Sequence, residues 1–141
     1  MSIQFRAASE TDLARLCALD TSAPTDPARG PQIAAWIAAG AAHVAIQNGV
    51  VAGYGVITHT FFHAGMIEML MIAEPFRQHG LGTGLLAFLE TLCRTDTLWS
   101  STNLSNRGMQ SLFERTGFVH SGLIEGLDEG DPEVIYRKRL R

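Results

Sequence analysis

The sequence predicts an α+β fold with a mixed, mostly antiparallel sheet of six to seven strands and about four helices on its faces. Three observations lead to this prediction. The chain has 141 residues, of which 46% are hydrophobic and 18% charged, as in a globular chain with a substantial core. Segments with the two-residue period of a strand and segments with a helical period follow one another along it. No internal repeat or linker interrupts this order, so we predict one domain over residues 1–141.

The N-terminal segment predicts a strand and a helix. Ile3 and Phe5 alternate with polar residues, as in a half-buried strand. Ser9 and Asp12 have the spacing of an N-cap pair at the start of a helix. The apolar residues on the buried side of this helix are Leu13, Leu16 and Cys17.

A loop and a second helix follow. Residues 21–30 contain two prolines and one glycine, and this composition predicts a loop. Pro31 suits the first position of a helix, which we expect to end near Ala39. The residues that this helix would bury are Ile33, Trp36 and Ile37.

The middle of the chain predicts a hairpin. Asn48-Gly49 separates an alternating apolar segment from a β-branched and aromatic segment at 50–60, which is typical of two strands joined by a type I′ turn. Gly53 and Gly55 within the second arm indicate a bulge or a close approach of another backbone. A further turn near residues 63–65 would lead into a third antiparallel strand.

The stretch from Met66 to Leu86 predicts a strand, a loop and a helix. Residues 66–72 are almost wholly apolar, and Pro75 would end the strand because proline cannot donate to a ladder. Three glycines then open a segment with helical apolar spacing, namely Gly80, Gly82 and Gly84. Bare backbone N–H groups at a helix N-terminus, with Arg77 just before them, predict a phosphate or pyrophosphate site.

The last third of the chain predicts a strand, a helix and two strands. Residues 97–102 have the pattern of a short strand. Asn106 can cap a helix that Gly117 would end in the left-handed conformation. Residues 118–124 and 134–140 predict the final two strands, with an acidic, glycine-containing loop between them.

Two common glycine-loop sites do not fit this stretch. A dinucleotide site requires GxGxxG after the first strand and an acidic residue about twenty positions later, where this chain has Ser100 and Ser101. A P-loop requires a lysine after its last glycine, and no lysine lies nearby. The spacing therefore argues against a nucleotide-binding module.

Composition narrows the partners further. The formal net charge is -3 and no basic cluster precedes the C-terminal end, so we expect no nucleic-acid partner. Cys17 and Cys93 are isolated, which predicts reduced thiols in a cytoplasmic protein and no metal site. We see no export signal, and the longest apolar run, 33–46, is too short to span a membrane.

The chain resembles the GNAT superfamily of acetyl-CoA-dependent N-acetyltransferases at several places. Residues 77–82, RQHGLG, match every fixed position of the family pattern R/Q-x-x-G-x-G/A. The preceding LMIAEPF is similar to the fourth strand of the family, and residues 106–118, NRGMQSLFERTGF, are similar to its second motif. The opening FRAASETDL also resembles a typical family start. The resemblance implies a GNAT-like fold over the whole chain.

The resemblance also implies which residues hold acetyl-CoA. The loop amides would bind the pyrophosphate, the backbone of the fourth strand would pair with the pantetheine arm, and Asn106 would contact the pantetheine side. The positions that it assigns to the cosubstrate are Leu70, Met71, Ile72, Arg77, Gln78, His79, Gly80, Leu81, Gly82, Thr83, Gly84, Asn106 and Phe113.

Two positions bear on proton transfer. Glu68 is the one charged residue in an otherwise apolar strand, and relatives often carry glutamate or histidine there. We therefore predict Glu68, partly buried, as the general base that accepts the proton of the amine. Relatives often protonate the departing thiolate with a tyrosine where this chain has Phe113, and phenylalanine cannot donate. Tyr54, Tyr136 or solvent could take that role.

The leading hypothesis is an N-acetyltransferase that moves the acetyl group of acetyl-CoA directly to a primary amine of a small molecule, peptide or protein. The alternative is an acyl-CoA-binding sensor or regulatory domain without turnover, which Phe113 favours. Exposed strand edges at the C-terminal end suggest a homodimer.

Overall fold

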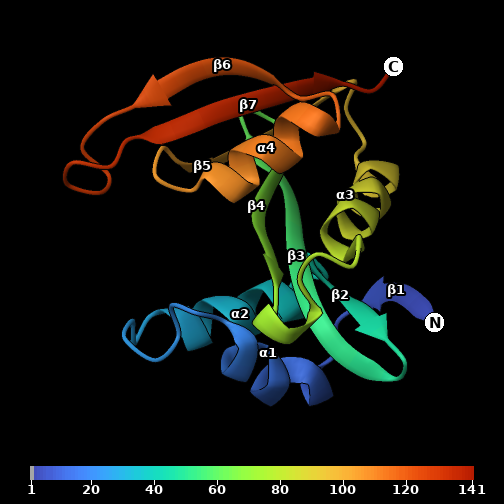
Figure 1. Ribbon diagram of the computed structural model, residues 1–141. Helices are drawn as coiled ribbons and strands as arrows, with labels where there is room; N and C mark the ends of the chain where they lie inside the picture. The colour runs from blue at the N-terminus through green and yellow to red at the C-terminus, as the bar shows by residue number, and fades with distance from the viewer. Residues whose placement is uncertain (1) are drawn as a thin grey trace. The chain divides into compact units, whose positions relative to one another are not determined.

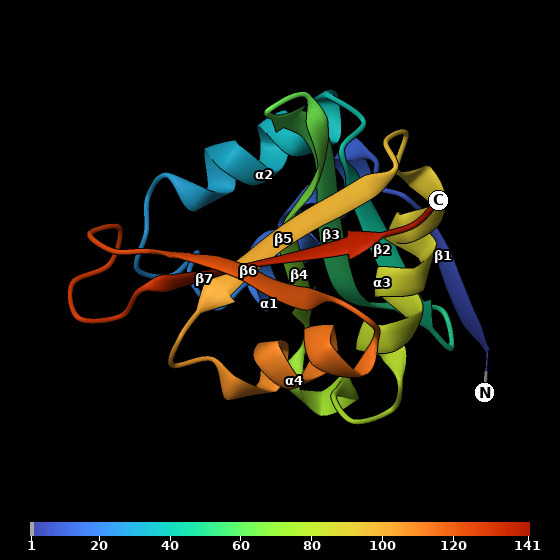
Figure 2. The same cartoon turned by 90° about the horizontal axis from the view of Figure 1, so that it is seen from above.

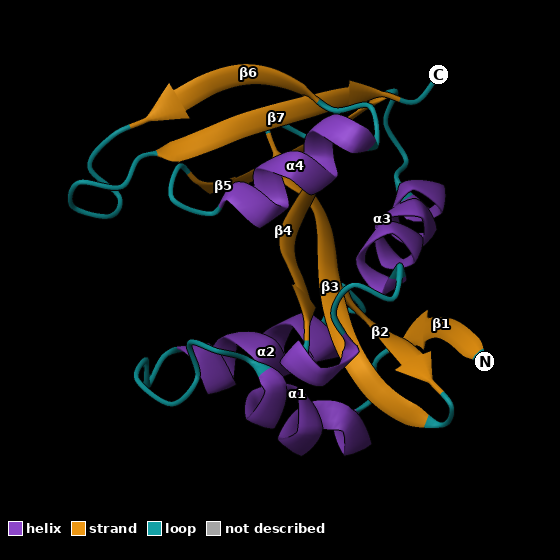
Figure 3. Cartoon of the chain, viewed as in Figure 1, coloured by secondary structure: helices purple, strands orange, loops and turns teal. Residues whose placement is uncertain are grey.

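The protein is described by a computed structural model that covers residues 2–141. Its elements are shown in Figures 1 and 3. In chain order they are β1 (Ile3–Ala7), η1 (Glu10–Asp12), α1 (Leu13–Leu19), α2 (Arg29–Ala38), β2 (Ala42–Gln47), β3 (Val50–Phe61), β4 (Ala64–Ile72), η2 (Glu74–Phe76), α3 (Leu81–Leu92), β5 (Thr97–Asn103), α4 (Arg107–Arg115), β6 (Val119–Ile124) and β7 (Glu133–Arg139).

The strands form a seven-stranded sheet in the order β1-β2-β3-β4-β5-β7-β6. Strands β4 and β5 are parallel, whereas β1 with β2, β2 with β3, β5 with β7 and β6 with β7 are antiparallel. The predicted mixed, mostly antiparallel sheet with four helices is therefore confirmed.

The residues gather into two compact units. The first unit contains residues 2–57 and Met69–Leu89, and the second contains Thr58–Glu68 and Glu90–Arg141. Strands β3 and β4 each begin in one unit and end in the other. We describe each unit by itself.

Helices α1 and α2 and strands β2 and β3 supply most of the core of the first unit. Fully buried apolar side chains come from each of these elements, namely Leu16, Ile33, Val44 and Val56. The N-cap pair is confirmed, because the Ser9 backbone N–H donates to Asp12 Oδ2 at 2.8 Å. The chain enters α1 through the short 3-10 turn η1.

Helix α2 begins earlier than predicted. It starts at Arg29, so the predicted loop is two residues shorter and Pro31 is the third helical residue instead of the first. Proline is accepted there because the N–H groups of the first turn have no partner within the helix. The expected end near Ala39 is correct to one residue.

The hairpin of β2 and β3 is confirmed, including its turn. Asn48 and Gly49 have φ of 50° and 81°, as a type I′ turn requires. The register shifts between Ala45 and Ile46, which is a bulge. The close approach predicted at Gly53 is also present, because a Cβ there would lie 2.5 Å from the carbonyl oxygen of Met71.

The turn between β3 and β4 lies earlier than predicted. Phe62 and His63 make it, with φ of 51° and 64°, and β4 already begins at Ala64. Gly65, which suggested the turn, lies within the strand, where a Cβ would come within 2.5 Å of Cys93 Sγ. Its small size therefore serves packing, and two non-glycine residues take up the left-handed conformation.

A buried carboxylate, Asp20, organises the loop after α1. Its oxygens accept hydrogen bonds from the Tyr54 hydroxyl at 2.5 Å, the Arg29 guanidinium at 3.0 Å and the backbone N–H groups of Ser22 at 2.8 Å and Ala23 at 3.1 Å. Burial alone would raise the pKa of the Asp20 carboxyl, but these hydrogen bonds together lower it. The loop and α2 are thus fixed to β3.

We expect Tyr54→Phe to lower the free energy of unfolding by about 1–3 kcal/mol, because it leaves a buried carboxylate short of one donor. Urea unfolding at neutral pH measures the change. Tyr136→Phe is the matched control, since the Tyr136 hydroxyl makes no hydrogen bond to another of residues 2–141. Equal losses in the two variants would contradict a stabilising role for the Tyr54 hydroxyl.

The second unit pairs β5, β7 and β6, with α4 along this sheet (Figure 2). Phe113 on α4 is fully buried, with its ring centroid 5.1 Å from those of Phe118 and Tyr136. Gly117 has φ of 96°, which confirms the predicted left-handed end of this helix. The last two strands begin and end within one residue of their predicted bounds.

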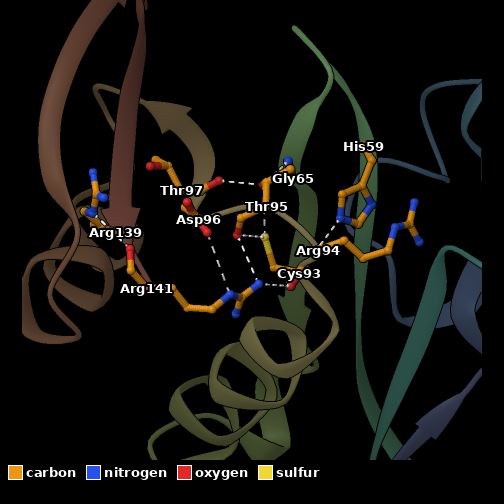
Figure 4. Close-up of polar contacts among 9 residues, drawn as sticks. All are labelled: His59, Gly65, Cys93, Arg94, Thr95, Asp96, Thr97, Arg139 and Arg141. Atoms are coloured by element: carbon orange, nitrogen blue, oxygen red, sulfur yellow. Dashed lines mark hydrogen bonds and ion pairs between the residues drawn. The ribbon is translucent and has the colours of Figure 1, made fainter.

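The end of the chain is attached to the segment that leaves α3 (Figure 4). Arg141 Nη2 donates to the carbonyl oxygens of Cys93 at 2.7 Å and Thr95 at 3.2 Å. Nearby, the backbone N–H of Arg94 donates to His59 Nε2 at 3.0 Å. Burial and the charge of Arg94 lower the pKa of His59, which keeps this nitrogen available as an acceptor. Within residues 2–141, no helix is both long and apolar enough to cross a membrane.

Candidate functional site

The glycine-containing loop between η2 and α3 has an unusual backbone. Gln78 and Gly80 have φ of 65° and 80°, so two left-handed residues lie close together just before α3 begins at Leu81. A left-handed glutamine is uncommon and strained, and such strain gathers at functional sites. A Cβ at Gly80 would meet no atom within 4 Å, so the space beside it is open.

This loop presents a run of unused backbone donors. Among residues 2–141, the N–H groups of residues 78–83 donate to no protein acceptor. The first helical bond is that of Gly84, whose N–H donates to the Gly80 carbonyl oxygen at 3.0 Å. Consecutive free amides at a helix N-terminus combine directed donors with a favourable dipole, which is the arrangement that binds phosphate groups.

The structure removes Gly84 from the residues whose backbone N–H groups were predicted to bind the pyrophosphate. Its N–H is already used in the helix, and a Cβ there would lie 2.8 Å from Phe5 Cζ. Gly84 is therefore small because α3 packs against β1, and it offers no free amide to a ligand. Leu81 has a side chain that is only 1% exposed, so it can serve a ligand only through its backbone.

Arg77 connects the loop to the end of β4. Its Nε donates to the Ile72 carbonyl oxygen at 2.9 Å, while most of the side chain is exposed. His79 is exposed as well. The cationic group of Arg77 thus lies beside the free amides in sequence and is held by the strand before them.

The last part of β4 carries the predicted pantetheine positions. Leu70, Met71 and Ile72 are half-buried. The sulfur of Met71 accepts a hydrogen bond from the backbone N–H of Thr21 at 3.4 Å. The Ile72 carbonyl oxygen already accepts from Arg77, so it is less available than its neighbours for pairing with a ligand. These residues and the glycine loop all belong to the first unit.

Glu68 belongs to the second unit and is exposed, which corrects the expectation of partial burial. The hydroxyl of Thr58 on β3 donates a short hydrogen bond to Glu68 Oε2. No lysine, arginine or histidine among residues 2–141 forms an ion pair with this carboxylate. The Glu68 carboxylate is thus accessible, and one of its oxygens is held by a hydrogen bond.

Asn106 has the N-cap role that its position predicted. Its Oδ1 accepts from the backbone N–H of Met109 at 3.1 Å at the start of α4. The other amide atom, Nδ2, donates to no group among residues 2–141 and can still bind a ligand. Capping and ligand binding are therefore compatible at this residue.

Phe113 and Tyr54 lie in the core and not at a ligand surface. Phe113 has no exposed area, so its side chain packs in the core, which corrects its inclusion among the cosubstrate-binding positions. Tyr54 is equally buried, and its hydroxyl is committed to Asp20. Burial and the Asp20 charge raise the pKa of Tyr54 far above its ordinary value, so it is unsuited to protonate a thiolate.

Comparison with known proteins decides the family. A family model described as the acetyltransferase (GNAT) family matches residues 11–118, which is most of the chain. The chain belongs to the GNAT family. Among curated protein sequences it has no significant match.

Solved structures agree with this assignment. A GNAT acetyltransferase from Bacillus cereus is 30% identical, with a TM-score of 0.91 and full coverage of both chains. Ard1 from Thermoplasma volcanium is 16% identical, with a TM-score of 0.88 and coverage of 100% of this chain and 99% of that one. The yncA protein from Salmonella typhimurium, solved with its cofactor acetyl-CoA, is 18% identical, with a TM-score of 0.79 and coverage of 100% of this chain and 95% of that one.

This GNAT chain is accordingly an acyltransferase that uses acetyl-CoA as the acetyl donor. The predicted fold class and family are confirmed. Sequence reasoning missed Thr58 and Asp20, because each acts through a partner on another element and neither belongs to a recognisable sequence pattern.

Proposed function

We propose that the protein transfers the acetyl group of acetyl-CoA directly to a primary amine, with the two units acting as one N-acetyltransferase domain and Glu68 as the general base. The observation that carries this proposal is the run of free backbone amides at residues 78–83, which suits a pyrophosphate. The acetyl-CoA in the yncA relative adds support from a protein of the same fold.

The loop and the strand before it would hold the cosubstrate. The pyrophosphate accepts hydrogen bonds from the amides of residues 78–83, with Arg77 supplying positive charge. The pantetheine arm lies along the backbone of Leu70 and Met71. None of these roles requires a particular side chain in the strand, which explains its plain apolar sequence.

Glu68 supplies the acid–base chemistry. The amine attacks only as the free base, so a carboxylate must take its proton directly or through one water. The amine nitrogen then bonds to the acetyl carbonyl carbon, the carbon–sulfur bond breaks, and the thiolate leaves with the bonding electron pair. Solvent protonates this thiolate, since Phe113 has no proton to donate, Tyr54 is committed to Asp20 and Tyr136 is only 2% exposed.

Direct transfer can be tested with the intact protein. Acetyl-CoA is incubated with a panel of primary amines that includes small amines, lysine peptides and peptides with free N-termini. We expect thiol release that depends on the amine, together with the acetylated amine by mass spectrometry. Intact-protein mass after incubation with acetyl-CoA alone is the second measurement, and an acetyl group bound covalently to the protein would contradict direct transfer.

A further inference from the structure

The carboxylate of Glu68 has one protein hydrogen-bonding partner within the described chain. The hydroxyl of Thr58, on the neighbouring strand β3, donates to Glu68 Oε2. No other side chain or backbone donor among residues 2–141 contacts either carboxylate oxygen. Oε1 therefore accepts no hydrogen bond from residues 2–141, and the Glu68 side chain is exposed to solvent.

An exposed glutamate needs such a partner to keep one geometry. It has three side-chain torsions, and an unrestrained glutamate samples many rotamers. Threonine is β-branched and therefore stiff at χ1, so a hydroxyl on a strand is a well-defined anchor. The bond from Thr58 fixes one oxygen of Glu68 and thereby limits where the other can lie.

We propose that Thr58 is a positioning residue, which holds the Glu68 carboxylate so that Oε1 can accept the proton of the acceptor amine. This inference rests on the proposed role of Glu68 as the base. A general base must lie within hydrogen-bonding distance of the proton that it takes, and a loosely held carboxylate is there for a smaller fraction of the time. Loss of the hydroxyl should consequently reduce turnover more than it reduces substrate binding.

The bond contributes little to folding, which makes the test clean. Glu68 is exposed and Thr58 is half-buried, and such a hydrogen bond adds only about 0.5–1.5 kcal/mol. Variants of Thr58 should therefore remain folded. The matched control is Thr60, which lies two residues further along the same strand, is exposed, and makes no side-chain hydrogen bond among residues 2–141.

The experiment compares steady-state kinetics of Thr58→Val, Thr58→Ser and Thr60→Val with acetyl-CoA and the best amine of the panel. We expect Thr58→Val to lower kcat by about 10-fold while KM for each substrate changes by less than about 2-fold. Thr58→Ser, which keeps the hydroxyl, should restore most of the loss, and Thr60→Val should behave as the unchanged protein. A loss in Thr58→Val that serine does not restore would overturn the inference.

A double variant separates this inference from the proposed base. If Thr58 acts through Glu68, Thr58→Val should have no further effect on kcat in a Glu68→Gln protein. Additive losses, or a normal kcat in Thr58→Val beside a depressed one in Glu68→Gln, would overturn the positioning role and leave the base in place. An unchanged kcat in Glu68→Gln would instead overturn the base, and the positioning role with it.

Discussion

Replacement of Glu68 by glutamine should lower kcat/KM by at least about 100-fold at neutral pH, because a positioned general base contributes about 10²–10⁴-fold. Glutamine has nearly the same shape, and its amide oxygen can still accept from the Thr58 hydroxyl, so the local structure should persist. The loss should therefore reflect proton transfer and not folding. Steady-state rates across a pH series measure it.

The pH profile provides the sharper criterion. With the carboxylate present, the enzyme can remove the proton of the bound amine, whereas Glu68→Gln can use only amine that is already the free base. The kcat/KM of Glu68→Gln should therefore depend more steeply on pH and recover as the pH approaches the pKa of the amine. Glu125→Gln is the matched control, since Glu125 is an exposed glutamate without a hydrogen bond to another of residues 2–141. An identical pH profile of kcat/KM in Glu68→Gln and the unchanged protein would remove Glu68 as the base.

Replacement of Gly80 by alanine should weaken acetyl-CoA binding by about 10-fold or more, because the left-handed conformation costs an L-residue about 1–2 kcal/mol. Gly80 has φ of 80°, and a loop that relaxes from this conformation no longer aims the amides of residues 78–83 together. Isothermal titration calorimetry with acetyl-CoA and the folded variant measures the change in Kd.

The control variant is Gly40→Ala, which forces alanine into the same left-handed conformation outside the loop. Gly40 has φ of 71°, and a Cβ there would also meet nothing within 4 Å. Gly40→Ala should lose similar stability but keep its Kd for acetyl-CoA. S-acetylpantetheine, which lacks the pyrophosphate, should bind both variants alike. If acetyl-CoA binds Gly80→Ala and Gly40→Ala equally well, the loop does not hold the pyrophosphate.

Turns and helix ends that are set by residues close in sequence could be predicted from the sequence. The Asn48-Gly49 turn, the Asn106 cap and the Gly117 helix end are examples, and each is confirmed. Their deciding interactions lie within a few residues, where backbone sterics and one side-chain hydrogen bond are enough. The family assignment succeeded for the same reason, since the loop pattern at 77–82, the strand before it and the motif at 106–118 each lie in a short segment.

Predictions that depended on distant partners were incomplete. The turn at Phe62 and His63 was placed too late because Gly65 is a typical turn residue, yet Cys93 explains its size. The bond between Asp20 and Tyr54 joins residues 34 positions apart, and nothing in either local sequence indicates it. Such contacts become visible only when the strands are placed side by side.

The glycine loop before α3 illustrates both kinds of feature, the ones that local sequence predicts and the ones that packing decides. The sequence by itself predicted an anion site before α3, because glycines and an arginine at a helix start are sufficient for that prediction. Only the tertiary structure decided that the amides of residues 78–83 are free while Gly84 serves the packing of Phe5, and that Thr58 orients Glu68. Backbone conformation is set by near neighbours, whereas the partner of each donor and side chain is set by packing between elements.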